Sequence, residues 1–315
     1  MLLTAVAAAF RHRPAFSSHH SGTLITHMIS AATVKELREK TNAGMMDCKK
    51  VLTETNGDMD AAIKLLRERG IAKAGAKADR AANEGVITAR IHDSATCGIL
   101  LEVNSETDFV SKNENFQNFV AQIADTLAAA NAADHAAALA VTLAGHSIEE
   151  SVKAKVVEIG ENLQFRKYVR YDAAPGGVIA SYIHPPGKVG VLIEVGTTKA
   201  ETAGTDAFKE LIKDLTLHIA ACAPKGLSRN DIPADVVDAE RDIFRARLAD
   251  SGKPENIIEN ILKGQINKFF AESCFLEQPF VKDDKVTITQ LLEAKGKELG
   301  DTLSVTRFVR FGLGE

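Results

Sequence analysis

The chain has 315 residues, a formal net charge of −4 and a hydrophobic content of 45%, with no tryptophan and 5% aromatic residues. Its length allows one large core or two to three small ones. The near balance of charge excludes a broad non-specific nucleic-acid binder, because such proteins rely on net positive charge. No apolar run reaches the roughly 18 residues that a membrane span requires.

Residues 1–28 differ in composition from the rest of the chain. No Asp or Glu occurs before Glu36, and the segment holds Arg11, Arg13, four histidines and several Ser and Thr residues. This composition is typical of an organellar transit peptide, and we expect a mitochondrial location rather than a plastid one. A secretory signal is disfavoured because the arginines follow the short apolar run. The alternative is a disordered tail without a targeting role.

Residues 29–83 predict a bundle of three short helices. Thr33 and Glu36 have the spacing of a capping box at the start of the first helix, Asp47 is placed to cap the second, and Asp58 is placed to cap the third. The third helix is expected to end at Gly70, followed by an Ala/Lys/Gly linker. A small bundle of this kind is suited to binding a partner.

A nearly exact internal repeat follows the bundle. Residues 85–103 return without a gap as residues 177–195, at an offset of 92 and with 9 of 19 positions identical. Each copy predicts two short antiparallel strands joined by a loop, and each is followed by apolar residues at helical spacing. The apolar positions are Phe116, Phe119, Ile123 and Leu127 after the first copy, and Phe208, Leu211, Leu215 and Ile219 after the second.

The two copies diverge directly after their second strand. The first continues as Asn-Ser-Glu-Thr-Asp-Phe-Val over residues 104–110, whereas the second continues as Gly-Thr-Thr-Lys-Ala-Glu-Thr over residues 196–202. An acidic and aromatic loop on one copy alone indicates a role that the scaffold itself does not need.

The fold class expected from these patterns is α+β. The helical bundle is followed by a duplicated α/β unit with antiparallel sheets, at residues 84–172 and 173–315. The second unit carries an inserted antiparallel helical hairpin at 233–273, with a turn at 251–254. Alternating residues at 304–311 predict a closing strand.

Motifs for covalent chemistry are absent from the sequence. There is no GxxxxGK[ST] loop, no GxGxxG and no HExxH. Cys48, Cys97, Cys222 and Cys274 are widely separated and form no CxxC pair, so we interpret them as reduced core residues. We therefore expect a protein that is not an enzyme, holds no cofactor and no metal, and acts by binding.

Four segments together resemble the elongation factor Ts family. They are Val34–Leu52, Glu102–Val110, Ile159–Asn162 and His184–Leu192, in the family's order. With its transit-like front, the chain is similar to an organellar member. The resemblance implies a UBA-like N-terminal bundle and a guanine-nucleotide exchange factor for organellar elongation factor Tu. It implies no direct contact with nucleic acid or membrane, and leaves self-association open.

The resemblance also implies the residues of the contact with the GTPase. Those in the bundle are Lys35, Arg38, Met45 and Met46; the alternative is that one methionine is a core residue and the charges are merely solvated. The others are Asp108, Phe109, Ile159, Gly160 and His184.

Asp108 and Phe109 are the exchange element by this resemblance. An aromatic wedge entering between two helices of the GTPase would move the elements that support its magnesium ion, and a carboxylate would compete for the groups around that ion. The alternative from the residues alone is a capped turn with Phe109 folded onto its own core. For His184 the alternative to a contact is a role in the repeat fold, because His92 occupies the equivalent position.

Two other classes of function remain open at this level. One is a scaffold or chaperone-like module whose bundle binds a different partner, and the other is a small-ligand regulatory protein built on the duplicated unit. The chain stops at Glu315, where bacterial members of the family carry a further helical module, so that contact is expected to be absent or replaced. The hairpin is expected to serve as a further partner contact, in self-association or in rigid packing.

Overall fold

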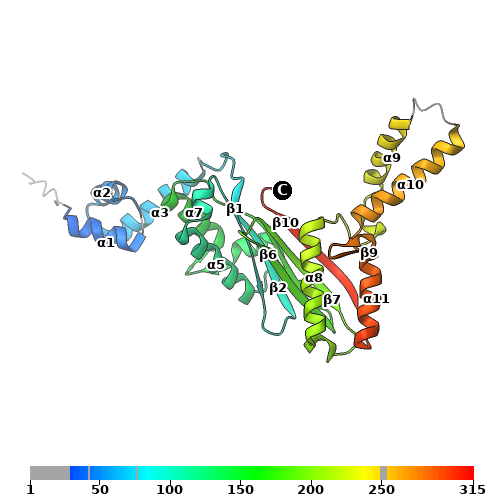
Figure 1. The fold of residues 1–315 in the computed structure, drawn as a ribbon. Helices are drawn as coiled ribbons and strands as arrows, with labels where there is room; N and C mark the ends of the chain where they lie inside the picture. Colours follow the sequence, from blue (N-terminus) through cyan, green and yellow to red (C-terminus); the bar gives the residue numbers. More distant parts are fainter. Residues whose placement is uncertain (1–28, 42, 76, 249–253) are drawn as a thin grey trace, which may run out of the picture. The chain divides into compact units, whose positions relative to one another are not determined.

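A computed structural model describes residues 29–41, 43–75, 77–248 and 254–315 (Figure 1). The predicted transit peptide, residues 1–28, lies outside the described residues. Internal contacts divide the chain into two compact units, with the division between Leu65 and Leu66. Within the described ranges, no helix is both long enough and apolar enough to cross a membrane.

The first unit holds two helices and the start of a third: α1 (Ala31–Thr41), α2 (Met45–Glu54) and α3 (Met59–Gly75). Its small core gathers buried apolar residues from all three. They are Val34 and Leu37 from α1, Cys48, Val51 and Leu52 from α2, and Ala62 from α3.

Two of the three predicted helix caps are wrong. The first helix begins two residues before Thr33, and the Ser30 hydroxyl accepts a hydrogen bond from the Thr33 backbone N–H at 3.1 Å. The second helix begins at Met45 after Gly44, which makes no side-chain cap, so Asp47 lies inside the helix. The cap at Asp58 is confirmed, because its carboxylate accepts from the Ala61 N–H at 3.0 Å.

The third helix extends beyond its predicted end. It continues past Gly70 to Gly75, so most of the predicted linker is helical. Alanine and lysine are strong helix formers, and a single internal glycine costs a helix only about 1 kcal/mol relative to alanine.

Within the described ranges, the second unit contains two three-stranded antiparallel sheets, three short helical turns and most of the helices. The elements in chain order are β1 (Glu84–Ile91), β2 (Cys97–Ser105), α4 (Asp108–Ser111), α5 (Glu114–Ala129), α6 (His135–Ala140), β3 (Thr142–Leu143), β4 (His146–Ser147), α7 (Ile148–Ile159), β5 (Gln164–Asp172), β6 (Gly177–His184), β7 (Val189–Gly196), η1 (Thr202–Gly204), α8 (Asp206–Cys222), η2 (Arg229–Asp231), α9 (Ala234–Leu248), α10 (Glu255–Ser273), η4 (Phe275–Glu277), β8 (Pro279–Phe280), β9 (Asp283–Thr287), α11 (Ile288–Leu299) and β10 (Ser304–Gly312).

The sequence repeat forms the same structure twice. The strand order is β1-β2-β5 in one sheet and β10-β7-β6 in the other, so β2 and β7 are the central strands. Val86 pairs with Val103 in the first sheet, and Val178 pairs with Val195 at the equivalent place in the second. The predicted strand pairs, the helices that follow them and the closing strand are confirmed, and the chain has an α+β fold.

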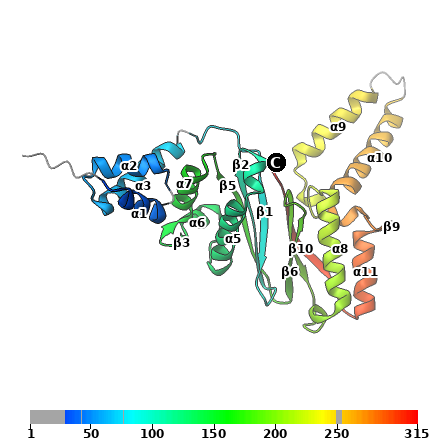
Figure 2. The same cartoon turned by 60° about the vertical axis from the view of Figure 1, so that its left-hand side comes forward.

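The two sheets lie face to face, with helices on their outer faces (Figure 2). Helices α5 and α7 pack on the first sheet, and α8 and α11 pack on the second. A third core lies between the sheets and is built from equivalent residues of both. Its buried members are Ile87, Leu100 and Tyr171 from the first sheet, and Ile179, Leu192 and Phe311 from the second.

The repeat continues further than its sequence offset suggests. Lys-Tyr-Val-Arg-Tyr at 167–171 in β5 matches Arg-Phe-Val-Arg-Phe at 307–311 in β10, at an offset of 140. The preceding helices α7 and α11 both begin with a capping box, and both end at a glycine with positive φ, Gly160 (91°) and Gly300 (63°). The inserted helices α9 and α10 increase the offset between the two copies, so this second half of the repeat does not align at an offset of 92.

Each central strand also carries one buried carboxylate at the same repeat position. Glu194 in β7 accepts hydrogen bonds from the Arg307 Nε at 2.6 Å and the Ala174 N–H at 2.9 Å. Glu102 in β2 accepts from the Gly314 N–H at 3.1 Å, and the Lys167 Nζ lies 3.4 Å from it.

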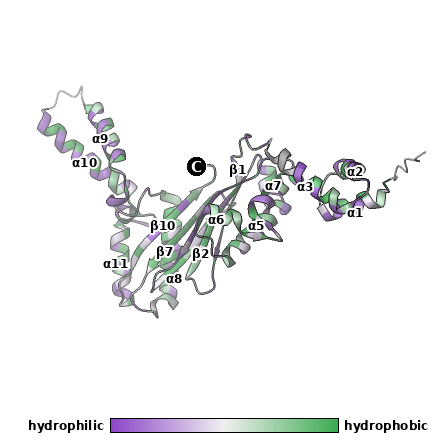
Figure 3. Ribbon diagram, turned by 180° about the vertical axis from the view of Figure 1, so that it is seen from behind, coloured by the Kyte–Doolittle hydropathy of each residue, from purple (hydrophilic) through white to green (hydrophobic). Residues whose placement is uncertain are grey.

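The insertion consists of α9 and α10, which pack on each other. Arg245 of α9 forms ion pairs with Glu255 and Glu259 of α10. Both helices carry hydrophilic and hydrophobic segments along their length (Figure 3). The predicted turn at 251–254 lies almost entirely outside the described residues.

Candidate functional site

The loop that distinguishes the first repeat ends in the short helix α4. The Thr107 hydroxyl caps this helix by accepting a hydrogen bond from the Val110 N–H at 3.4 Å. Phe109, in the first turn of α4, is 83% exposed, the highest value among the large apolar side chains of the described residues. Phe109 therefore does not fold onto its own core, which excludes the structural alternative for this residue.

Asp108 is held as a carboxylate beside Phe109. The Lys112 Nζ donates a hydrogen bond to it at 2.6 Å, and this bond, together with the charge of Lys112, lowers the pKa of Asp108 below its ordinary value. A second pair, Lys188 with Glu84 at 3.0 Å, lies close enough for the charge of Lys188 to lower the same pKa further.

Four residues of two loops join the start of α4 to the end of α7. Glu161 accepts two hydrogen bonds from Thr107, from its N–H at 3.1 Å and from its hydroxyl at 2.7 Å. In return, Glu106 accepts from the Asn162 N–H at 2.6 Å. We call these four residues, Glu106, Thr107, Glu161 and Asn162, the loop clamp. The clamp brings the predicted pairs Asp108–Phe109 and Ile159–Gly160 to one end of the first sheet.

Ile159 and Gly160 have different roles in this arrangement. Ile159 is partly buried against the core of the first repeat. Gly160 is exposed, and its carbonyl accepts a hydrogen bond from the Lys77 Nζ at 2.5 Å. Because a side chain is disfavoured at a positive φ of 91°, a glycine suits this helix end.

His184 lies exposed at the end of β6. Its Nδ1 is 3.0 Å from the Tyr182 hydroxyl, and the turn that follows it carries Lys188, the partner of Glu84. The equivalent His92 is also exposed, with its Nδ1 2.8 Å from the Ser94 hydroxyl. Both histidines thus bond locally. The turn after His184 carries Lys188, whose partner Glu84 lies at the start of β1 and pairs with Ser105 at the end of β2.

The four predicted contact residues of the first unit are all exposed. Met45 is 46% and Met46 76% exposed, so neither methionine is a core residue. Lys35 and Arg38 lie on the solvent side of α1, and the Lys35 Nζ is 3.7 Å from Glu39.

The loop clamp was not predicted. Its four residues lie in segments that resemble the family, and the signal that points to Glu161 is the repeat at an offset of 140. At that offset Glu161 corresponds to Asp301. Asn104 was also missed: it is fully buried at the base of the loop, and its side-chain amide has no hydrogen-bond partner within the described structure.

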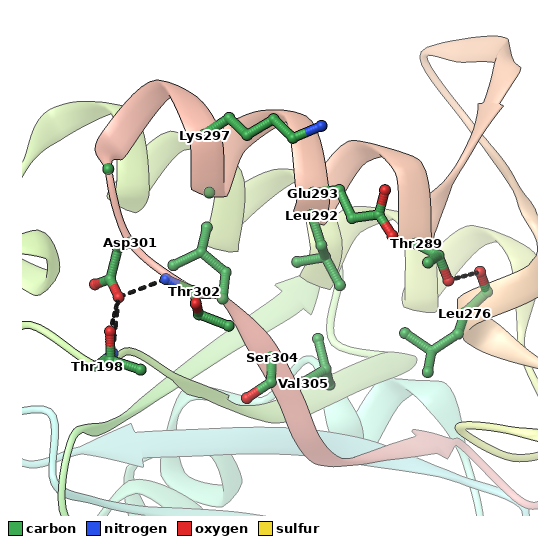
Figure 4. A pocket seen from close by; sticks show the side chains of 13 residues that line it. Thr198, Leu276, Thr289, Leu292, Glu293, Lys297, Asp301, Thr302, Ser304 and Val305 are labelled. Atoms are coloured by element: carbon green, nitrogen blue, oxygen red, sulfur yellow. Dashed lines mark hydrogen bonds between the residues drawn. The ribbon is translucent and has the colours of Figure 1, made fainter.

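The second repeat contains a clamp of the same kind without a counterpart of the Asp108–Phe109 loop (Figure 4). Asp301 accepts hydrogen bonds from the Thr198 N–H at 3.0 Å and from its hydroxyl. Beside this clamp, α11 and β10 line an open cavity of about 650 Å³. The chain that follows Thr198 is Lys-Ala-Glu, so no aromatic residue stands where Phe109 stands in the first repeat.

The candidate site offers groups that can contact another molecule. The hydrogen-bonded loops carry an exposed aromatic ring, an ion-paired carboxylate and a helix end, and no group of three or more metal-ligating side chains occurs among the described residues. The fold and these exposed side chains are those of an α+β protein that is built on a duplicated unit and offers a surface suited to contact.

Comparison with known proteins identifies its family. The sequence model of the family described as Elongation factor TS matches residues 106–315. The chain is 44% identical over 290 residues to an elongation factor Ts of Trichlorobacter lovleyi, covering 91% of this chain and 93% of that protein. It is 45% identical to those of Syntrophotalea carbinolica and Thioalkalivibrio sulfidiphilus, over 91% of this chain and 93% and 92% of theirs. The chain belongs to the elongation factor Ts family.

Proposed function

We propose that this protein is a guanine-nucleotide exchange factor for organellar elongation factor Tu in translation elongation. It binds the GDP complex, disturbs the magnesium and phosphate site, releases GDP and holds the empty GTPase until GTP binds. The observation that carries the proposal is Phe109, held exposed beside the ionised Asp108 on a clamped loop. Phe109 is the most exposed of the large apolar side chains of the described residues, and a partner that covers the ring would remove its apolar area from water.

Phe109 and Asp108 have separate roles in this mechanism. Phe109 enters between two helices of the GTPase and displaces the elements that support the ion. Asp108 brings a negative charge to the groups that hold the water shell of the magnesium ion. Gly160, with no side chain, lets the end of α7 approach the phosphate-binding loop of the GTPase. His184 contacts the same region through its imidazole.

The first unit supplies affinity rather than exchange. Lys35 and Arg38 pair with acidic groups of the GTPase, and Met45 and Met46 provide an adaptable apolar contact in a UBA-like bundle. Linkage then fixes the energetics, because exchange requires tighter binding to the empty GTPase than to the GDP complex. A thousandfold difference corresponds to a coupling of about 4 kcal/mol, and it weakens GDP binding by the same factor. No covalent step, cofactor or bound metal of this protein takes part.

Residues 1–28 direct the protein to the mitochondrial matrix in this proposal. The support is compositional: the segment contains arginines but no acidic residue. Fusing these residues to a fluorescent protein tests it, with Arg11→Gln and Arg13→Gln together as the matched control. Mitochondrial signal that the control loses supports the proposal, whereas plastid or cytosolic signal from the unaltered segment contradicts it.

Stopped-flow release of a fluorescent GDP from the matching elongation factor Tu tests the exchange function. Residues 29–315 are expected to accelerate release by orders of magnitude. Asp108→Ala and Phe109→Ala together are expected to remove most of that acceleration, whereas Val281→Ala, at another exposed apolar residue, is the control and leaves it intact. Binding without acceleration would favour the scaffold alternative instead.

A further inference from the structure

The loop clamp connects the exchange loop to the end of a helix through very few bonds. Thr107 contributes both its N–H and its hydroxyl to the Glu161 carboxylate. No other described hydrogen bond holds the Thr107 side chain to a distant part of the chain. The position of Asp108 and Phe109, which follow Thr107 directly, therefore depends on Glu161.

The direction of these hydrogen bonds shows how Glu161 acts on α4. A hydroxyl has one proton to donate, and Thr107 gives it to Glu161 at 2.7 Å. The lone pairs of the same oxygen are then turned toward the Val110 N–H, which donates at 3.4 Å and forms the helix cap. A cap of this kind stabilises the first turn of a helix by about 1 kcal/mol. That first turn carries Asp108 and Phe109.

The reciprocal bond closes the clamp from the other side. Glu106, just before Thr107, accepts from the Asn162 N–H at 2.6 Å, and Arg80 lies 3.5 Å from the same carboxylate oxygen. The Asn162 side chain is buried and donates to the Ala78 and Arg80 carbonyls. The loop is thus hydrogen-bonded to the buried Asn162 through Glu106, and Glu161 is the residue that hydrogen-bonds to Thr107.

The second repeat provides an internal comparison. Asp301 holds Thr198 through the same two groups, the N–H and the hydroxyl (Figure 4). Asp301 also accepts from the Lys199 and Thr302 N–H groups, at 3.2 and 2.6 Å. The scaffold therefore uses this kind of clamp in both units, whereas only the clamp at Glu161 is followed by an exposed aromatic residue.

We propose that Glu161 is a positioning residue for nucleotide exchange, which fixes Thr107 and thereby presents Phe109 and Asp108 to the GTPase. This inference rests on the proposed function and adds a residue that acts through another. Without Glu161 the loop samples other conformations, and the exchange-competent fraction falls. The apparent exchange efficiency falls in proportion to that fraction.

The test measures GDP release from elongation factor Tu at increasing concentrations of the exchange factor, with residues 29–315. Glu161→Ala is expected to lower the maximal release rate about tenfold, the result of a tenfold smaller competent fraction. Glu161→Gln is expected to retain most of the rate, because its amide can accept from the Thr107 N–H and donate to the hydroxyl. Thr107→Ser keeps the N–H and the hydroxyl that Glu161 binds, and it is expected to retain most of the release rate as well.

Asp301→Ala is the matched control. It removes a clamp with more hydrogen bonds, so it is expected to lower the thermal midpoint at least as much as Glu161→Ala while leaving the release rate unchanged. A triple variant separates positioning from general destabilisation. In the background of Asp108→Ala and Phe109→Ala together, Glu161→Ala is expected to cause little further loss of release rate, because it acts through these two residues.

Hydrogen exchange of the amides at 107–111 provides a readout without the GTPase. Glu161→Ala is expected to accelerate exchange there, whereas Asp301→Ala is not. The inference is overturned, with the proposed function intact, if the unaltered protein accelerates GDP release from the GTPase and Glu161→Ala accelerates it equally. An equal loss of release rate in Asp301→Ala also overturns it, as does a further loss when Glu161→Ala is added to the Asp108→Ala and Phe109→Ala double variant. An unaltered protein that does not accelerate release overturns the proposed function and the positioning role together.

Discussion

The two repeats of the second unit share their strands, the capping boxes of α7 and α11 and their buried carboxylates, but they differ in the loop after the central strand. In the first repeat the central strand leads through Thr107 into an exposed Phe109, and in the second it leads through Thr198 into Lys199 and Ala200. Both threonines are held by an acidic side chain from the end of a helix. Both repeats therefore keep the bond from the acidic side chain to the threonine, while the residues that follow the threonine differ.

The largest effect is expected from the core residues that the two repeats share. Phe116 in α5 and Phe208 in α8 are equivalent and fully buried. Truncating either to Ala is expected to lower the free energy of unfolding by about 3–5 kcal/mol, because each leaves a cavity under its sheet. Urea unfolding of both variants measures this. Equal losses support an equivalence of the repeats, and a small loss in one alone would contradict it.

Removing the basic partner of the buried carboxylate is expected to cost more stability in the second repeat than in the first. Arg307→Met removes the bond at 2.6 Å to the buried Glu194 and is expected to cost about 2 kcal/mol, less than a fully buried pair because Arg307 is partly exposed. Lys167→Met is expected to cost less than about 1 kcal/mol, since Glu102 keeps Arg166 at 3.7 Å and the Gly314 N–H. Urea unfolding compares them, and the reverse order would show that Lys167 is the main partner of Glu102.

Gly160 and Gly300, the glycines that end α7 and α11, are expected to differ in their effect on GDP release but not in their effect on stability. Gly160→Ala and Gly300→Ala each place a side chain at positive φ, and each is expected to cost about 1 kcal/mol of stability. Only Gly160→Ala is expected to slow GDP release, by roughly tenfold if the added methyl group costs the contact 1.4 kcal/mol. Thermal unfolding and stopped-flow release are measured on the same preparations. Equal slowing by both variants would argue for a general effect on folding.

The smallest effect concerns pH. Desolvation acts to raise the pKa of Asp301, but hydrogen bonds from Thr198 and from neighbouring backbone N–H groups outweigh it and hold the pKa well below its ordinary value. A carboxyl whose pKa is lower in the folded state stabilises the fold above its unfolded pKa of about 3.9 and loses that contribution as the pH falls further. The difference in urea midpoint between the unaltered protein and Asp301→Ala is therefore expected to be full at pH 7 and smaller at pH 3. A constant difference would show that the charge of Asp301 is not what Thr198 requires.

Periodicity and repetition predicted most of the fold because both record the burial of side chains. The helices with Phe116 and Phe208 and the strand pairs were found in this way, since an apolar stripe has a period set by local geometry. Helix starts at Ala31 and Met45 were misplaced, because several Ser, Thr and Asp residues compete to cap and only the folded backbone selects one. The predicted end of α3 at Gly70 is wrong, because one glycine costs little in a helix whose neighbours are strong helix formers.

The candidate site was predicted only in part for a different reason. Phe109 and Asp108 were visible as a departure from the repeat, and their exposure and ionisation were not. The bonds between Thr107 and Glu161 join residues far apart in the sequence, and no local pattern encodes such a pair. A repeat search that allowed for the inserted helices would have aligned Glu161 with Asp301 and pointed to both clamps.

The placement of β10 has a consequence for the order in which the chain folds during synthesis. The first sheet is complete once β5 has been made, because Leu101 pairs with Tyr168. The second sheet pairs Ile193 with Phe308, and these two residues lie much further apart in the sequence than Leu101 and Tyr168. The Gly314 N–H then donates a hydrogen bond to Glu102 in the first sheet. Pairings between distant residues form slowly because they close long loops. On the ribosome, β6 and β7 therefore wait beside a finished first sheet, with the outer edge of β7 unpaired until the last strand emerges.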